Sequence, residues 1–162
     1  MALAPGHDVP NNPQLPVVVH RRAVPPEVDD VAGWLEARFA ANGWVGAWRD
    51  GVFDHHHYHA TAHEVLGIAR GSVEVMLGGA GGVLVTLGEG DVAVLPAGTG
   101  HCRVGATSRL VVVGAYPSGQ SPDLRRAGDS LADAARRIAR VPVPDADPVQ
   151  GADGALVRLW TR

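Results

Sequence analysis

Short apolar runs alternate with turn-forming residues along the middle of the chain. Between residues 44 and 115, segments rich in Val and Leu follow one another, and each ends at Gly, Asp or Pro. Val73, Val75 and Leu77 occupy every second position of their segment, which is the period of a half-buried strand. The pattern predicts eight strands, over residues 44–48, 52–59, 64–69, 72–77, 83–87, 92–95, 101–104 and 109–115. Eight strands at this spacing favour an all-β barrel or jelly roll.

The two ends of the chain show a different pattern. In residues 27–42, apolar side chains recur at three- and four-residue steps, with acids near the start and Asn-Gly at the end, which predicts an amphipathic helix. Residues 129–140 predict a second helix that Asp129 or Ser130 can cap. The Pro-rich first 26 residues are expected to form an extended arm with one strand. A last apolar run, residues 155–160, is expected to add a strand.

Size and composition fit one compact domain. The chain has 162 residues, of which 46% are hydrophobic, enough to bury a sizeable core. We expect residues 1–43 to form the arm and first helix, 44–115 the barrel, and 116–162 the second helix and tail. The net charge of −3 and the scattered Lys and Arg residues give no basic patch, so nucleic acid is not an expected partner.

The sequence also bears on where the protein works. The N-terminal residues lack the charged start and apolar run of a signal peptide, and no segment approaches the roughly 18 apolar residues of a membrane span. The single cysteine, Cys102, cannot form an intrachain disulfide. We therefore expect a cytoplasmic protein without a membrane partner.

Histidines are concentrated in one short segment. Five of the eight lie within residues 55–63. If residues 52–59 form a strand, His55, His57 and His59 project to one face, and convergent neutral imidazoles suit a transition metal. Tyr58 and His56 would lie on the opposite face.

Two histidines leave a divalent ion short of ligands, and other residues can complete the set. Glu64 opens the next predicted strand, so its carboxylate is expected to lie beside the imidazoles across adjacent strands. His101 follows a tight turn, Pro96 to Gly100, that can hold one more imidazole in place. His63 competes with Glu64, because a strand shifted by one residue would exchange them. His55 and His63 therefore stay as additional ligands or as groups that support the ligands.

The spacing of these residues resembles that of the cupin superfamily. The first cupin motif is matched by Gly51, His57, His59, Glu64 and Gly71, and the second by Gly90, Pro96, Gly98 and His101. The chain departs from the second motif at Gly105, where the family usually has Asn. Outside the motifs, residues 9–16, 63–67, 77–79 and 147–149 resemble the bacterial YjlB-like cupins.

This resemblance implies a fold, a cofactor and an assembly. It implies a double-stranded β-helix, the cupin jelly roll, that is usually dimeric and holds a metal near one mouth of the barrel. The implied cofactor is one divalent ion, Fe, Mn, Ni or Zn, bound by His57, His59, Glu64 and His101. Cys102 is expected to be a buried structural residue that points away from His101.

Two functions are compatible with such a site. In the first, the protein is a metal-dependent enzyme that acts on a small organic molecule, either as a dioxygenase or as a Lewis-acid isomerase or decarboxylase, with Glu64 as a catalytic base. In the second, it is a module that binds or senses a small molecule, and the metal is structural or absent. A metal-free epimerase is disfavoured because the metal-binding set is complete. The four Trp residues are expected to pack in the core.

Overall fold

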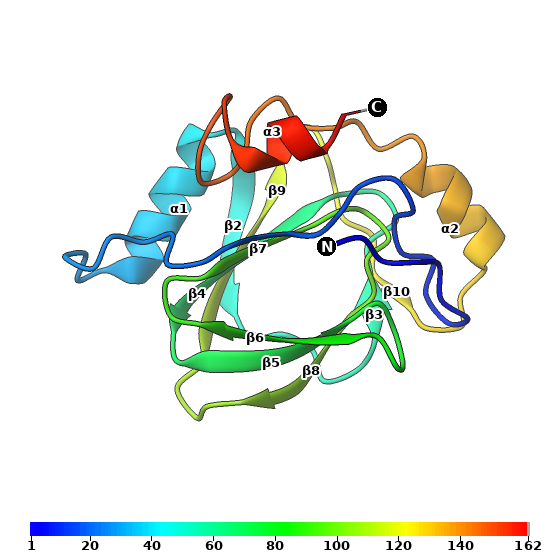
Figure 1. Cartoon of the computed structure of the whole chain (residues 1–162), viewed down its shortest axis with the longest axis horizontal. Helices are drawn as coiled ribbons and strands as arrows, with labels where there is room; N and C mark the ends of the chain where they lie inside the picture. Colours follow the sequence, from blue (N-terminus) through cyan, green and yellow to red (C-terminus); the bar gives the residue numbers. More distant parts are fainter. Residues whose placement is uncertain (162) are drawn as a thin grey trace.

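Two antiparallel five-stranded sheets face each other in the structure, a computed structural model that describes residues 1–161 (Figure 1). Arg162, the last residue of the expected C-terminal segment, lies outside the described residues. In spatial order, the first sheet contains β1 (Val18–His20), β7 (Val92–Leu95), β4 (Glu64–Arg70), β9 (Val111–Pro117) and β2 (Trp44–Asp50). The second contains β10 (Arg125–Arg126), β3 (His57–Tyr58), β8 (His101–Ala106), β5 (Ser72–Leu77) and β6 (Val83–Gly88). The predicted all-β jelly roll is confirmed.

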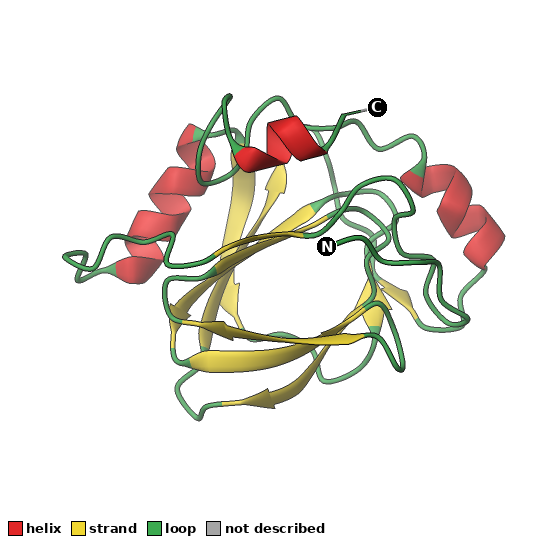
Figure 2. Cartoon of the chain, viewed as in Figure 1, coloured by secondary structure: helices red, strands yellow, loops and turns green. Residues whose placement is uncertain are grey.

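The central strands of the first sheet, β7, β4 and β9, are covered on both faces, which explains their continuous apolar sequences. Figure 2 shows the helices outside the two sheets, and α1 (Val31–Ala41) and α3 (Ala155–Leu159) pack on the first sheet. All four residues of β7 are buried. A Cβ atom at Gly67 of β4 would lie 2.9 Å from Leu35 and 3.0 Å from Phe39, so glycine at this position lets α1 approach the sheet closely.

The space between the two sheets forms a second apolar core. It includes Leu66 and Ile68 from β4 and Val73, Val75 and Leu77 from β5. In β5 the buried residues alternate with Glu74 and Met76, as the period of two predicts. The other side of the second sheet is partly covered by α2 (Leu131–Ile138), whose buried residues pack against Tyr58. Among the described residues, no helix has the length and apolar character of a membrane span.

One predicted helix boundary and one predicted strand require correction. The first helix begins at Val31 and not near residue 27, because the Asp30 carboxylate accepts a hydrogen bond from the Gly33 backbone N–H at 3.0 Å and caps the helix there. The predicted strand over residues 155–160 is wrong, since residues 155–159 form α3. Side-chain oxygens of Gln150 and Asp147 accept hydrogen bonds from the first backbone N–H groups of this helix. These distant acceptors favour a helix over a strand.

The predicted strand over residues 52–59 is mostly a loop. Only His57 and Tyr58 form β3, and His57 pairs with His101 of β8. On the other edge, β3 pairs with β10, a two-residue strand that the sequence pattern did not predict. The polar run before His57 has no alternating apolar residues to hold it on the sheet, and Phe53 there is 50% exposed.

Candidate metal centre

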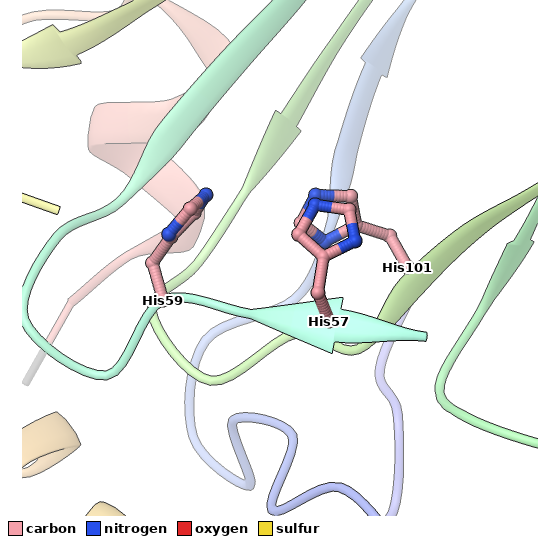
Figure 3. Close-up of side chains that lie close together, drawn as sticks. All are labelled: His57, His59 and His101. Atoms are coloured by element: carbon pink, nitrogen blue, oxygen red, sulfur yellow. The ribbon is translucent and has the colours of Figure 1, made fainter. Parts of the chain in front are cut away.

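Three imidazoles, two from strands of the second sheet and one from the residue that follows β3, lie close together (Figure 3). His57 of β3 lies directly opposite His101 of β8, and the ring centroids are 3.9 Å apart. His59 follows the end of β3 and turns its ring toward the same space. One nitrogen atom of each ring lies within 4.8 Å of a nitrogen of each of the others. The structure thus brings together the three histidines that the sequence indicated.

The other nitrogen of each ring is fixed by a backbone carbonyl. These Nδ1 contacts join His57 to the carbonyl of His55 at 3.1 Å, His101 to that of Thr99 at 3.0 Å, and His59 to that of Asp123. A carbonyl oxygen only accepts hydrogen bonds, so each Nδ1 must carry the hydrogen atom. A neutral ring held in this way presents its Nε2 lone pair, which is the tautomer that metal-binding histidines use.

Glu64 reaches the imidazoles from the facing sheet. Its Oε2 atom lies 3.3 Å from His101 Nε2 and 3.4 Å from His59 Nε2. Glu64 lies near the imidazoles, as expected. The expectation that it comes from a strand adjacent to β3 is wrong, because Glu64 is in β4 of the first sheet. Oε2 is buried and makes no hydrogen bond with any part of the chain that the structure describes.

A buried carboxylate oxygen between two imidazole nitrogens is costly unless a positive charge lies there, carried by a metal ion or by a proton on an imidazole. Two ligand atoms that each lie about 2.1 Å from one ion are separated by roughly 3.0–3.4 Å, depending on the coordination geometry. The distances from Glu64 Oε2 to the two Nε2 atoms match this separation. The residues present therefore fit a divalent transition metal with three nitrogen ligands and one oxygen ligand.

The electrostatics of His57 and Glu64 suit metal ligands, whereas the raised pKa of His59 means that a metal would compete with a proton for this ring. Burial, together with the nearby His101 ring, lowers the pKa of His57 to about 3, so this imidazole is neutral near pH 7. For Glu64, burial acts to raise the pKa, but the contacts with His59 and His101 outweigh it and hold the pKa well below its ordinary value. For His59, burial acts to lower the pKa, and the Glu64 carboxylate reverses this and raises it. Metal binding requires neutral imidazoles and an ionised carboxylate.

A cavity of about 250 Å³ opens beside the cluster. Apolar and aromatic side chains make up much of its wall, and Glu64 and the three histidines form one side. The lining residues are Trp48, Asp50, Gly51, Val52, Phe53, His57, His59, Glu64, Leu66, His101 and Tyr116. A cavity of this size admits a small organic molecule next to the candidate ligands.

Two further candidates from the sequence lie outside the three-histidine cluster. His63 is fully buried, accepts a hydrogen bond from the Ala97 backbone N–H at Nδ1, and contacts the Pro142 carbonyl at 3.2 Å through Nε2. Both of its ring nitrogens are thus engaged elsewhere, and the structure does not bring it to the cluster. His55 is half-buried and stacks on Phe53 at a centroid distance of 5.1 Å.

The N-terminal arm fixes the turn that carries His101. The Asn11 side chain accepts a hydrogen bond from the Gly100 backbone N–H at 3.1 Å, and the Asn12 side chain donates one to the Ala97 carbonyl at 3.0 Å. Gly98 has a φ of +93°, and a Cβ atom there would lie 2.6 Å from the Asn11 carbonyl oxygen. The motif glycine is therefore required both by the backbone conformation and by the close approach of the arm.

Three residues of the site were not found from the sequence. Trp48 and Tyr116 line the cavity, although all Trp residues were expected in the core. Asp123 holds His59 through its backbone carbonyl and, through its side chain, accepts hydrogen bonds from the backbone N–H groups of Ala60 and Thr61. These contacts join residues more than 60 positions apart, so no local pattern indicates them.

We expect Asp123→Ala to weaken metal binding by about 10-fold. This variant lacks the carboxylate that accepts hydrogen bonds from the backbone N–H groups of residues 60 and 61. The backbone carbonyl of residue 123, which orients His59, is then held less firmly. Competition of Zn²⁺ with a chromophoric chelator measures the change. Asp129→Ala is the matched control, because Asp129 is exposed in the same segment and accepts only a backbone hydrogen bond from Arg126 among the described contacts. Equal affinities of the two variants would contradict this role of Asp123.

Comparison with known proteins gives one extensive sequence match. The chain is 32% identical over 155 residues to a protein of Bacillus subtilis (strain 168) described as uncharacterized protein YjlB, and the match covers 95% of this chain and 91% of the relative. No family model matches the chain.

Two solved structures show partial likeness to the fold. One is an acireductone dioxygenase from Bacillus anthracis with a cadmium ion in its active centre, with a TM-score of 0.45, 16% identity, and coverage of 68% of this chain and 84% of that chain. The other is a DUF861 family protein from Thermotoga maritima, with a TM-score of 0.37, 19% identity, and coverage of 61% of this chain and 97% of that chain.

The two facing antiparallel sheets form a cupin-type jelly roll, and three histidines lie close together inside it. Within this class, the sequence match extends over the arm, the barrel and the tail. The chain belongs to the YjlB-like family.

Proposed function

We propose that this protein is a metal-dependent enzyme that acts on a small organic molecule. One divalent ion, Fe, Mn, Ni or Zn, would be held by Nε2 of His57, His59 and His101 and by the carboxylate of Glu64. The observation that carries the proposal is the buried Glu64 Oε2 atom, which lies between two imidazole Nε2 atoms at the wall of a cavity.

When bound, such an ion supplies Lewis-acid polarisation of a substrate oxygen or, as Fe(II), the capacity to react with dioxygen. The chain's own residues bind and orient the substrate. Leu66 and Val52 are almost fully buried and exclude water from one wall of the cavity. Glu64 faces the cavity, so its carboxylate is placed to take a proton from a substrate held there.

The test separates metal binding from catalysis. Protein loaded with Fe(II) is incubated with diketones, catechols and thiols while oxygen uptake is followed, and protein loaded with Mn, Ni or Zn is assayed by mass spectrometry for isomerised or decarboxylated products. The proposal expects turnover of at least one compound and its loss in Glu64→Gln. If Glu64→Gln and His101→Ala lose the metal and yet keep full affinity for a ligand found by thermal-shift screening, the protein is a binding module and not this enzyme.

A further inference from the structure

A tyrosine and a tryptophan form a hydrogen-bonded pair in the cavity wall. The Trp48 indole Nε1–H donates to the Tyr116 hydroxyl at 3.0 Å. An indole N–H can only donate, so the phenol oxygen is the acceptor in this contact, and the phenol hydrogen is left to point elsewhere. Tyr116 also lines the cavity, on the same wall as Glu64 and the His59 ring, whose centroid lies 6.0 Å from that of the phenol. Because the phenol oxygen already accepts from Trp48, the O–H group of Tyr116 can donate a hydrogen bond to an acceptor in the cavity.

The backbone is shaped to hold this pair. β2 is bulged between Val45 and Trp48, where Gly46 has a φ of +68°. Beyond the bulge, Trp48 lies opposite Gly114 of β9. A Cβ atom at Gly114 would lie 2.1 Å from the indole ring, so the ring rests against β9 only because that residue is glycine. Trp48 is thereby fixed beside Tyr116, which follows Gly114 by two residues in β9.

The rest of the cavity wall limits the charge of a ligand. Leu66 and Val52 are buried, and Phe53 lies edge-on to the His57 ring at a centroid distance of 4.9 Å. Asp50 and Glu64 are the charged residues among those that line the cavity, and neither Lys nor Arg is present in this described lining. An anionic group away from the candidate metal would meet no positive side chain there. An apolar or aromatic body would contact these side chains favourably.

We propose that Tyr116 donates a hydrogen bond to an oxygen atom of the substrate, and that the substrate is a small uncharged molecule with an apolar or aromatic body. This proposal rests on the proposed function, because the metal ligands place the reacting end of the substrate beside Tyr116. The Trp48 indole positions the phenol, and the apolar wall accommodates the body of the substrate.

The test measures binding and not turnover. The protein is loaded with Co(II), and benzohydroxamic acid is titrated while the visible spectrum is recorded; this aromatic probe is neutral in solution and binds a metal through two oxygen atoms, releasing one proton to the buffer. We expect Tyr116→Phe to raise the Kd of this probe about 5- to 10-fold, with the Co(II) content unchanged. Trp48→Phe is expected to raise the Kd by a smaller factor, because the phenol remains but loses its orienting partner.

Tyr58→Phe is the matched control for the loss of a tyrosine hydroxyl. The Tyr58 side chain is fully buried among the residues that pack under α2, and its hydroxyl has no hydrogen-bond partner among the described residues. The Kd of the probe should not change in this variant. Thermal unfolding of each variant checks that the fold is intact.

Two further probes test the class of substrate. Acetohydroxamic acid lacks the aromatic ring, and we expect it to bind roughly 10-fold more weakly than benzohydroxamic acid. The 4-carboxy derivative of benzohydroxamic acid adds a negative charge and is expected to bind more weakly than its parent. Tighter binding of either probe than of benzohydroxamic acid would overturn the proposed substrate class.

The outcomes separate this inference from the proposed function. If the wild-type protein takes up no Co(II), the metal-dependent function itself fails. If Co(II) binds and the probe binds equally to wild-type protein and Tyr116→Phe, the role of Tyr116 is wrong while the metal centre stands. A Tyr58→Phe effect as large as that of Tyr116→Phe would also overturn the role of Tyr116.

Discussion

His101→Ala is expected to lower the affinity for a divalent transition metal by more than about 100-fold, since loss of a direct ligand exceeds the 10- to 100-fold cost of losing a supporting contact. His101 is central to the cluster, because it pairs with His57 across the strands and its Nε2 lies 3.3 Å from the Glu64 carboxylate. Competition against a chelator of known affinity measures the loss for Zn²⁺, and circular dichroism checks the fold.

The control variants distinguish the residues that the sequence left as alternatives. His7→Ala removes an exposed histidine and should leave the metal affinity unchanged. His63→Ala should lower the free energy of unfolding, because it removes the contacts with Ala97 and Pro142, but should retain the metal. Glu64→Gln should lower the metal affinity. If His63→Ala loses the metal and Glu64→Gln keeps it, the assignment of the oxygen ligand is wrong.

Asp147→Asn is expected to reduce the free energy of unfolding at pH 7 by at least about 2 kcal/mol. The Asp147 carboxylate is fully buried and accepts hydrogen bonds from three backbone N–H groups, those of Val149, Gln150 and Leu156. His20 Nε2 lies 3.0 Å from the same carboxylate. An amide in its place brings an NH₂ group that cannot accept, and some of these buried donors lose their partner.

The effect of Asp147 depends on pH in a defined direction. Burial acts to raise its pKa, but the contact with His20 and the three backbone hydrogen bonds outweigh it and lower the pKa to about 2. The unfolded chain takes up this proton near the ordinary pKa of about 3.9, so the stabilisation is complete above that value and is lost as the pH falls toward 2. Urea unfolding at several pH values should therefore show the gap between wild type and Asp147→Asn narrowing below pH 4, with the exposed Asp145→Asn as control. A gap independent of pH would contradict this account.

Much of the fold could be predicted because its strands carry local patterns. The alternation in β5 and the continuous apolar run of β7 indicate a half-buried and a fully buried strand. The errors occur where distant contacts decide the structure. Asp147 caps α3 from outside its sequence window, and the polar residues before His57 leave the sheet although they continue an apparent strand.

The candidate site, like the fold, could be predicted from the sequence only in part. The spacing of His57, His59, Glu64 and His101 indicated a cluster, and the structure brings these four residues together. The sequence could not indicate that Glu64 arrives from the opposite sheet, since this depends on the order of the strands. Nor could it indicate Tyr116, whose partner Trp48 lies 68 positions earlier. Neither Tyr116 nor Trp48 belongs to a motif with fixed spacing.

The metal content of the protein tests the central claim most directly. The chain is purified without a polyhistidine tag or chelator after growth with added Fe, Mn, Ni and Zn, and elemental analysis is performed on wild type and on His101→Ala. We expect about one divalent transition metal ion per wild-type chain and little in the variant. Less than about 0.2 ion per wild-type chain, or equal content in the two proteins, would contradict the central claim.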